Sequence, residues 1–329
     1  MTQKQTHIFD DMISSIETET SLSEHERNTL LKKMSLLKQT KVNILITGAT
    51  GCGKSSTINA LFQTSNAKIG TGVDPETMDI HKYELDNIVL FDSPGLGDGK
   101  EADRNHAKNI IDKLLERDAN GEFVIDLVLV LLDGSTRDLG TSFELINNVI
   151  IPNLGDDASR LLVAINQADV AMKGKYWNHE RNEPEPQLVA FLEDKVASTQ
   201  RRIHEATGID TTPIYYSAGY KDGDEQQYPY NLSKLLAHIL RHTREDKRVV
   251  FMQDLNRQEE MWQKDDQLEN YQEEIKSSIL SSLAQVALKA VPAVIESLLP
   301  AVGRALPTVA RTIVDVGSRF FSSVSSWFR

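Results

Sequence analysis

Residues 41–56, KVNILITGATGCGKSS, decide the fold of this chain of 329 residues. The run from Val42 to Thr47 is short, apolar and rich in β-branched residues, which predicts a strand buried on both faces. It leads into residues 48–55, GATGCGKS, which match the pattern G-x-x-x-x-G-K-[ST], and a predicted helix begins at Ser56. A strand, a glycine-rich loop and a helix in this order predict a binding site for nucleotide phosphates.

Each residue type in the loop has a chemical reason. Glycines let the backbone turn so tightly that successive N–H groups point at one phosphate, and the following helix presents its positive end to the same anion. Lys54 supplies a point charge for the β- and γ-phosphates, and Ser55 supplies a hydroxyl for Mg²⁺. The predicted nucleotide-binding residues of the loop are Gly48, Ala49, Thr50, Gly51, Cys52, Gly53, Lys54, Ser55 and Ser56.

Composition narrows the class of protein. The net charge of −12 and the pI of about 5.2 argue against direct nucleic-acid binding through bulk charge, although a local basic patch stays open. Cys52 is the one cysteine, so no intrachain disulfide can form, which suits a reducing cytoplasm. The first residues lack the pattern of a secretory signal, and no uncharged apolar run reaches the ~20 residues that span a bilayer. We therefore expect a cytoplasmic protein.

The segments on either side of the loop predict an α/β fold. Residues 80–85 and 88–91 form a predicted hairpin, and further strands are predicted at 123–132, 161–165 and 214–216. Helices are predicted at 101–117, 139–151, 188–206 and 231–243. This alternation predicts a doubly wound, mostly parallel sheet with an antiparallel edge hairpin, flanked by N- and C-terminal helices. Ligand loops then lie at the carboxyl ends of the strands.

The second strand of the hairpin ends in residues 92–95, DSPG. An acidic residue at the end of a strand, followed by a turn that contains glycine, is typical of the second phosphate-site motif of P-loop proteins. Asp92 is predicted to hold Mg²⁺ through water, and the Gly95 N–H to reach the γ-phosphate.

Five motifs occur in order: GATGCGKS, a loop threonine, DSPG, NQAD and YSAG. Together they resemble the P-loop GTPases of the Era-like and TrmE-like superfamily. The stretches GKSSTINALF, FDSPGLGDG and NQADVAMKGKYW are most similar to the bacterial YfjP-type GTPases of that group. The resemblance covers about residues 40–245. It implies a G domain that binds GTP and GDP with Mg²⁺ and hydrolyses GTP to GDP and phosphate.

The resemblance also assigns roles to residues outside the loop. Thr77 matches the switch threonine that coordinates Mg²⁺ and the γ-phosphate, with Thr71 as the alternative. The implied catalytic residues are Lys54, Thr77 and Gly95, and the implied metal ligands are Ser55, Thr77 and Asp92.

The NQAD and YSAG motifs are implied to read the guanine base. Asn166 and Asp169 match the base-reading motif, and Gln167 between them is also counted among the nucleotide-binding residues. Ser217 and Ala218 match the motif whose backbone N–H meets the guanine carbonyl. A carboxylate accepts hydrogen bonds from guanine N1–H and from the exocyclic amine. Adenine offers no matching pair of donors and would leave that carboxylate without partners.

Two positions, Gln167 and Leu96, depart from the family pattern, and Gly51 bears on the consequence of the second departure. Gln167 stands where the family has a lysine whose aliphatic stem packs over the base, so we expect modest guanine affinity. Leu96 stands where Ras-like enzymes have the glutamine that orients the attacking water. Gly51 stands where potassium-activated relatives have an asparagine. Intrinsic hydrolysis should therefore be slow, and dimerisation across the nucleotide face or a partner protein is the expected activator.

The two ends of the chain are predicted to be helical. Apolar residues recur at helical spacing from Ile8 to Ile16, and Ser23 with Glu26 forms a predicted capping box for a second helix. A pair packed on the nucleotide domain and a partner-binding arm both stay open. Residues 245–276 are rich in charged side chains and are predicted to be a solvated helical connector. The predicted divisions are residues 1–40, 41–245 and 246–329.

Residues 277–329 predict an amphipathic helix that prolines 292, 300 and 307 divide. Three interpretations stay open: packing within the protein or a homodimer, peripheral contact with the inner face of the membrane, and binding of another partner. Function beyond the switch is equally open. A ribosome-associated GTPase and a membrane-associated, self-assembling GTPase are the main hypotheses, and a P-loop ATPase is the third.

Overall fold

The computed structural model describes residues 7–20, 22–64, 68–70, 80–97, 99–155, 157–222 and 225–287. Thr71, Thr77 and residues 288–329 of the predicted amphipathic tail lie outside these described residues, so the expectations about them remain predictions.

Within the described residues, seven strands form the central sheet in the order β2-β3-β4-β1-β5-β6-β9. The strands from β4 to β9 in this order all run parallel, while β3 is antiparallel to both β2 and β4 at one edge. Their bounds are β1 (Val42–Gly48), β2 (Lys68–Gly70), β3 (His81–Glu84), β4 (Ile88–Asp92), β5 (Leu127–Asp133), β6 (Leu161–Asn166) and β9 (Ile214–Tyr215). The predicted mostly parallel sheet with an antiparallel edge hairpin is confirmed.

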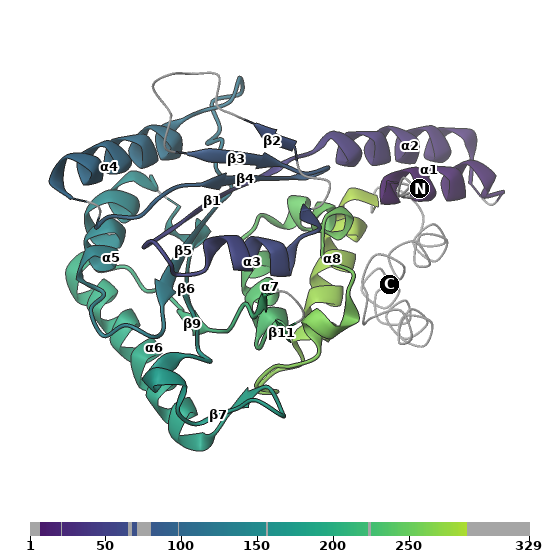
Figure 1. Ribbon diagram of the computed structural model, residues 1–329. Helices are drawn as coiled ribbons and strands as arrows, with labels where there is room; N and C mark the ends of the chain where they lie inside the picture. The colour runs from purple at the N-terminus through teal and green to yellow at the C-terminus, as the bar shows by residue number, and fades with distance from the viewer. Residues whose placement is uncertain are drawn as a thin grey trace.

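Helices cover both faces of the sheet (Figure 1). One face carries α4 (Lys100–Leu115), α5 (Gly140–Glu144) and α6 (Pro186–Thr207), and α5 continues as a π-helical segment, Leu145–Ile150. The other face carries α3 (Lys54–Leu61), α7 (Leu232–Arg241) and α8 (Tyr271–Ala287). Two small hairpins lie outside the central sheet: β7 (Trp177–Asn178) with β8 (Glu183–Pro184), and β10 (Tyr220–Asp222) with β11 (Glu225–Gln227).

The side-chain alternation of the strands divides the apolar residues into two cores. In β5, Leu127, Leu129 and Leu131 join the core beneath α3, α7 and α8. The residues between them, Val128 and Val130, join the core beneath α4, α5 and α6. Both faces of β5 are buried, which explains why its sequence is an unbroken apolar run.

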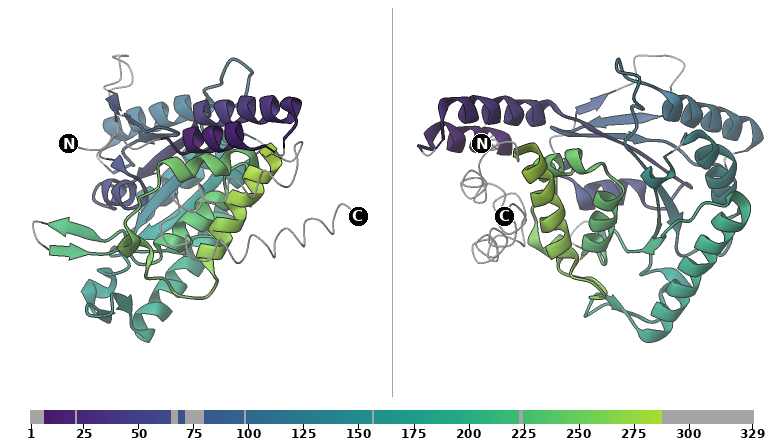
Figure 2. Two further views of the ribbon diagram at one scale, coloured as in Figure 1. Left: turned by 90° about the vertical axis from the view of Figure 1, so that its right-hand side faces the viewer. Right: turned by 180° about the vertical axis from the view of Figure 1, so that it is seen from behind.

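The two N-terminal helices, α1 (Ile8–Thr18) and α2 (Glu24–Gln39), are present, and the capping box is confirmed. Phe9, Met12 and Ile16 of α1 are fully buried and belong to the core on the α8 side of the sheet. Figure 2 shows the pair lying along one side of the molecule. The geometry supports a helical pair packed on the nucleotide domain.

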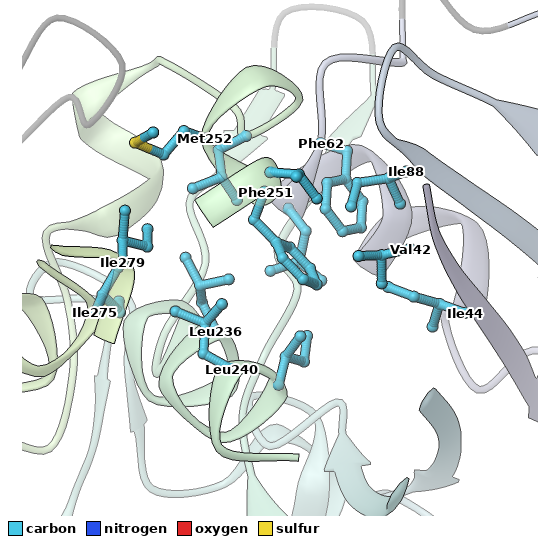
Figure 3. Packing of buried hydrophobic residues seen from close by; sticks show 14 of the residues in the cluster. Val42, Ile44, Phe62, Ile88, Leu236, Leu240, Phe251, Met252, Ile275 and Ile279 are labelled. Carbon is cyan, nitrogen blue, oxygen red and sulfur yellow. The ribbon is translucent and has the colours of Figure 1, made fainter. Parts of the chain in front are cut away.

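The prediction of a solvated connector after residue 245 was wrong. Residues 245–253 form a 3₁₀ segment, η6 (Glu245–Gln253), whose Val249, Val250, Phe251 and Met252 are all 0% exposed. Figure 3 shows Phe251 between residues of the sheet side and the helix side, and its ring centroid lies 6.5 Å from that of Phe62. The apolar residues of this stretch are few but consecutive. A 3₁₀ helix has three residues per turn, so consecutive residues point to different sides, and they contact both the sheet and α8.

Among the described helices, none combines the length and the apolar character that crossing a bilayer requires.

Candidate nucleotide-binding site

The glycine-rich loop between β1 and α3 has the backbone that its sequence predicts. Gly53 has φ +87°, and a Cβ atom there would lie 2.2 Å from the side-chain nitrogen of Asn166. A Cβ atom on Gly48 would lie 2.3 Å from the carbonyl oxygen of Leu131. Because glycine has no Cβ atom, the loop packs closely against the ends of β5 and β6 at these two positions, and a larger residue would collide there.

Lys54 and Ser55 lie in the first turn of α3, where the loop N–H groups and the helix dipole favour an anion. The Lys54 ammonium donates hydrogen bonds to the carbonyl oxygens of Gly48, at 2.8 Å, and Ala49, at 3.3 Å. Ser55 and Ser56 are exposed on the same turn. Cys52 is buried, and burial raises the pKa of its thiol, so this side chain supports the loop from below as a neutral group.

Asp92 ends β4 directly beside the loop, because the parallel register pairs it with Ile46 of β1. Burial raises the pKa of its carboxyl group, and the Lys54 charge opposes that change. One carboxylate oxygen, Oδ1, is buried without a hydrogen-bond partner. A buried carboxylate oxygen that lacks a donor, at the end of the strand that pairs with β1, fits a ligand for a hydrated cation such as Mg²⁺.

The turn after Asp92 lies against the phosphate loop. A Cβ atom on Gly95 would lie 2.7 Å from the carbonyl carbon of Gly48, so only glycine allows this approach. Nδ1 of buried His106, from α4, lies 3.2 Å from the Gly95 carbonyl oxygen. Leu96 instead packs against the core beneath α4. Its side chain therefore serves packing and offers no polar group to the loop.

The NQAD motif connects the phosphate loop to the YSAG motif. The Asn166 side-chain amide donates to the carbonyl oxygen of Cys52 at 2.9 Å, and its oxygen accepts the N–H of Ala218 at 2.9 Å. Gln167 has φ +62° and donates from Nε2 to the Gly51 carbonyl oxygen at 2.6 Å. Asn166 and Gln167 thus both donate to the phosphate loop, and Asn166 also connects the loop to Ala218 of the YSAG motif.

Asp169 is almost buried, with 8% of its surface exposed. Its Oδ1 accepts the hydroxyl of Ser217 at 2.7 Å, and its Oδ2 accepts a hydrogen bond from Nε2 of Gln227 at 2.9 Å. The structure therefore brings the predicted phosphate-binding, metal-binding and base-reading residues together at the carboxyl ends of β1, β4, β6 and β9. Thr77 is the exception, because it lies outside the described residues.

Two residues near the site, Gln227 and Lys195, are not predicted by any sequence motif. Gln227 contacts Asp169 from β11, and the only available signal was the DGD stretch at residues 222–224, which predicts a tight turn. Lys195 of α6 donates to the carbonyl oxygens of Asp133, Gly134 and Thr136, and burial lowers its pKa. It holds the loop after β5, and a lysine within an amphipathic helix gives no signal of such a contact.

The mostly parallel sheet with its antiparallel pair, and the helices around it, are consistent with the G domain of a P-loop GTPase. Residues 43–167 match the family model described as 50S ribosome-binding GTPase. This part of the chain is therefore similar to P-loop GTPase domains.

Individual relatives match parts of the chain. Interferon-inducible GTPase 1 of Mus musculus is 44% identical over 62 residues, 17% of this chain and 15% of that protein. The probable GTP-binding protein EngB of Streptococcus uberis is 28% identical over 140 residues, 42% of this chain and 66% of that protein. The solved structure of the LeoA bacterial dynamin GTPase from ETEC has a TM-score of 0.40 at 13% identity, over 97% of this chain and 50% of that one. The chain thus spans less than two thirds of the length of each of these relatives.

Proposed function

We propose that this protein binds GTP and GDP, hydrolyses GTP to GDP and phosphate, and acts as a conformational switch. One observation carries the proposal: Asn166 hydrogen-bonds both to the phosphate loop and to Ala218, next to a carboxylate on Asp169. A phosphate cradle and a carboxylate suited to guanine are thereby fixed in one rigid site, and the family match of residues 43–167 agrees with it.

Each side chain has a defined task in this proposal. Lys54 and the loop N–H groups neutralise the phosphates, and the N–H of Gly95 meets the γ-phosphate. Ser55, Asp92 and Thr77 would hold Mg²⁺, which supplies charge neutralisation at the β- and γ-phosphates when bound. Asn166, Gln167, Asp169, Ser217 and Ala218 select guanine over adenine.

The binding proposal is tested by titration of the protein with fluorescent GDP, with unlabelled ADP as competitor. We expect GDP to bind, ADP not to compete, and Lys54→Ala to weaken GDP binding at least tenfold through loss of the phosphate charge. Lys108→Ala is the matched control, because Lys108 is exposed on α4. Tight ADP binding, or GDP binding that is indifferent to Lys54, would contradict the proposal.

We propose further that hydrolysis is slow until a second copy of the chain completes the site. The support is Leu96, which packs against the core and leaves the attacking water without the usual orienting side chain. A second support is the surface beside the base-reading segment, where four apolar or aromatic side chains are exposed: Val170, Tyr176, Tyr220 and Tyr228. Such side chains are common at protein interfaces.

The test is the hydrolysis rate per molecule against protein concentration. A rate that climbs with concentration supports activation by self-association. A rate that stays slow and flat contradicts it and indicates that a partner protein supplies the missing group.

The cellular role is proposed at the level of the family. The Era-like and YfjP-type resemblance and the description of the matching family favour a cytoplasmic, ribosome-associated GTPase. Co-sedimentation with ribosomal subunits in GTP, lost in GDP, tests this role. The amphipathic sequence of residues 277–329 favours the alternative of peripheral membrane contact. Flotation with anionic liposomes that is lost on deleting residues 288–329 would favour the alternative instead.

A further inference from the structure

The chain after the YSAG motif turns back on itself and returns to the base-reading segment. Ser217 pairs with Tyr230, and Tyr220 pairs with Gln227 in the same antiparallel register. The left view of Figure 2 shows the resulting hairpin, β10–β11, projecting from the molecule. Gly219 has φ +68°, and a Cβ atom there would lie 2.2 Å from the Gln227 carbonyl oxygen. The lack of a side chain at Gly219 lets β11 approach the site closely.

This return places the Gln227 amide on the carboxylate that is proposed to read guanine. Gln227 Nε2 donates to Asp169 Oδ2 at 2.9 Å, while the Ser217 hydroxyl donates to Oδ1 at 2.7 Å. Asp169 is 8% exposed, and the Ser217 hydroxyl and the Gln227 amide each bond one of its carboxylate oxygens. Without Gln227, a nearly buried charged oxygen would lose a donor, which is costly.

Guanine offers two donors to a carboxylate, its N1–H and its exocyclic amine. The amide of Gln227 is a donor of the same kind as that amine, and it already bonds one of the two carboxylate oxygens. We propose that Gln227 is a specificity-determining residue that takes the place of the guanine amine when the base is absent. This inference rests on the proposed guanine-nucleotide function.

Two consequences follow from this exchange. Guanine binding replaces one hydrogen bond to Asp169 with another, so the exocyclic amine adds little affinity in the native protein. Hypoxanthine, the base of IDP, has the N1–H but no amine, and the Gln227 amide stays on Oδ2 when it binds. The native protein therefore discriminates weakly between GDP and IDP, and removal of the Gln227 amide sharpens the discrimination.

The test is a titration of the full-length protein with GDP and with IDP. In Gln227→Ala, the guanine amine no longer has to displace a side-chain donor from Asp169 Oδ2. We therefore expect the GDP affinity to rise about tenfold, which corresponds to the free energy of one hydrogen bond to a charged group. IDP leaves Oδ2 without a partner in this variant, so the ratio of the IDP and GDP dissociation constants should also rise about tenfold. Gln226→Ala is the control, because the Gln226 amide bonds to Tyr220 and Gln227 carbonyl oxygens instead of Asp169.

A second variant predicts the opposite change. Gln227→Lys places a charged donor on Asp169, which guanine displaces less easily, so GDP affinity should fall at least tenfold. Unchanged or weakened GDP binding in Gln227→Ala, or an unchanged IDP to GDP ratio, overturns the inference while native GDP binding leaves the proposed function standing. A native protein that binds neither nucleotide overturns the proposed function itself.

Discussion

The surroundings of Asp92 suit the role of cation ligand that we propose for it. Burial makes its charged form costly, Lys54 offsets part of that cost, and Oδ1 is left without a donor. A second positive charge at this oxygen would relieve the remaining cost. The arrangement explains why an acidic residue is useful at the end of β4, where most buried positions are apolar.

Removal of the metal tests this role. We expect a chelator to weaken binding of a non-hydrolysable GTP analogue by at least tenfold in the native protein, because the phosphates then lack their counter-charge. In Asp92→Asn, which keeps the shape and removes the charge, Mg²⁺ should improve binding much less. Equal stimulation by Mg²⁺ in the native protein and in Asp92→Asn would contradict the assignment, and exposed Asp112→Asn serves as control.

At the level of single residues, the sequence predicts the parts of the site whose residues are adjacent in the chain. The loop from Gly48 to Ser56 is one continuous segment, so its pattern is visible without a fold. Gln227 and Asp169 are 58 residues apart, and only the hairpin after Gly219 brings them together. No local pattern marks such a pair, because each residue alone has an ordinary polar side chain.

At the element scale, the turn between β3 and β4 is held by a carboxylate from the C-terminal part of the chain. Asp254, just after η6, accepts the backbone N–H groups of Asp86 at 3.1 Å, Asn87 at 2.6 Å and Ile88 at 2.7 Å. The Asn87 side chain in turn donates to the carbonyl oxygen of Thr40, just after α2. The strand that carries Asp92 is therefore anchored at its start to both flanking segments.

This anchor has a predictable pH dependence. Burial raises the pKa of Asp254 from 3.8 to about 6 in the folded protein, so the folded state binds this proton more tightly than the unfolded state. The resulting stabilisation is complete below pH 3.8 and is lost as the pH rises through about 6, on the order of 2–3 kcal/mol. Asp254→Asn does not titrate, so the native melting temperature minus that of Asp254→Asn should fall between pH 4 and pH 7. A constant difference over this range would contradict the prediction.

At the scale of the whole molecule, the segments outside the nucleotide domain share its core. The cluster on the α8 side of the sheet includes residues of α1, α2, β1, η6 and α8. Phe251 lies within it and is fully buried, whereas Leu268, from the same predicted connector, is 70% exposed. The C-terminal part of the described chain is therefore a structural component of the nucleotide domain.

A matched pair of truncations measures this contribution. Phe251→Ala should lower the free energy of unfolding by about 3–5 kcal/mol, because it removes a large buried ring and leaves a cavity. Leu268→Ala should change it by less than about 0.5 kcal/mol. Chemical denaturation gives both values, and similar small effects of the two variants would show that η6 is not part of the core.

The sheet and its covering helices were predictable because their apolar patterns are long and regular. The core position of η6 was not, since a few consecutive apolar residues among charged ones also fit an exposed turn. Only the sheet and α8, which enclose Phe251 together, distinguish the two cases (Figure 3).

We propose that Asp169 selects guanine, and Asp169→Asn is the variant that probes this role. The measurement compares the dissociation constants of GDP and xanthosine diphosphate in the native protein and in Asp169→Asn. Xanthine carries a carbonyl where guanine has its amine, and an asparagine amide donates to that carbonyl where a carboxylate cannot. In Asp169→Asn we expect at least a hundredfold loss of GDP affinity together with a gain for xanthosine diphosphate. Unchanged GDP affinity, or equal loss of both nucleotides in a folded variant, would contradict it.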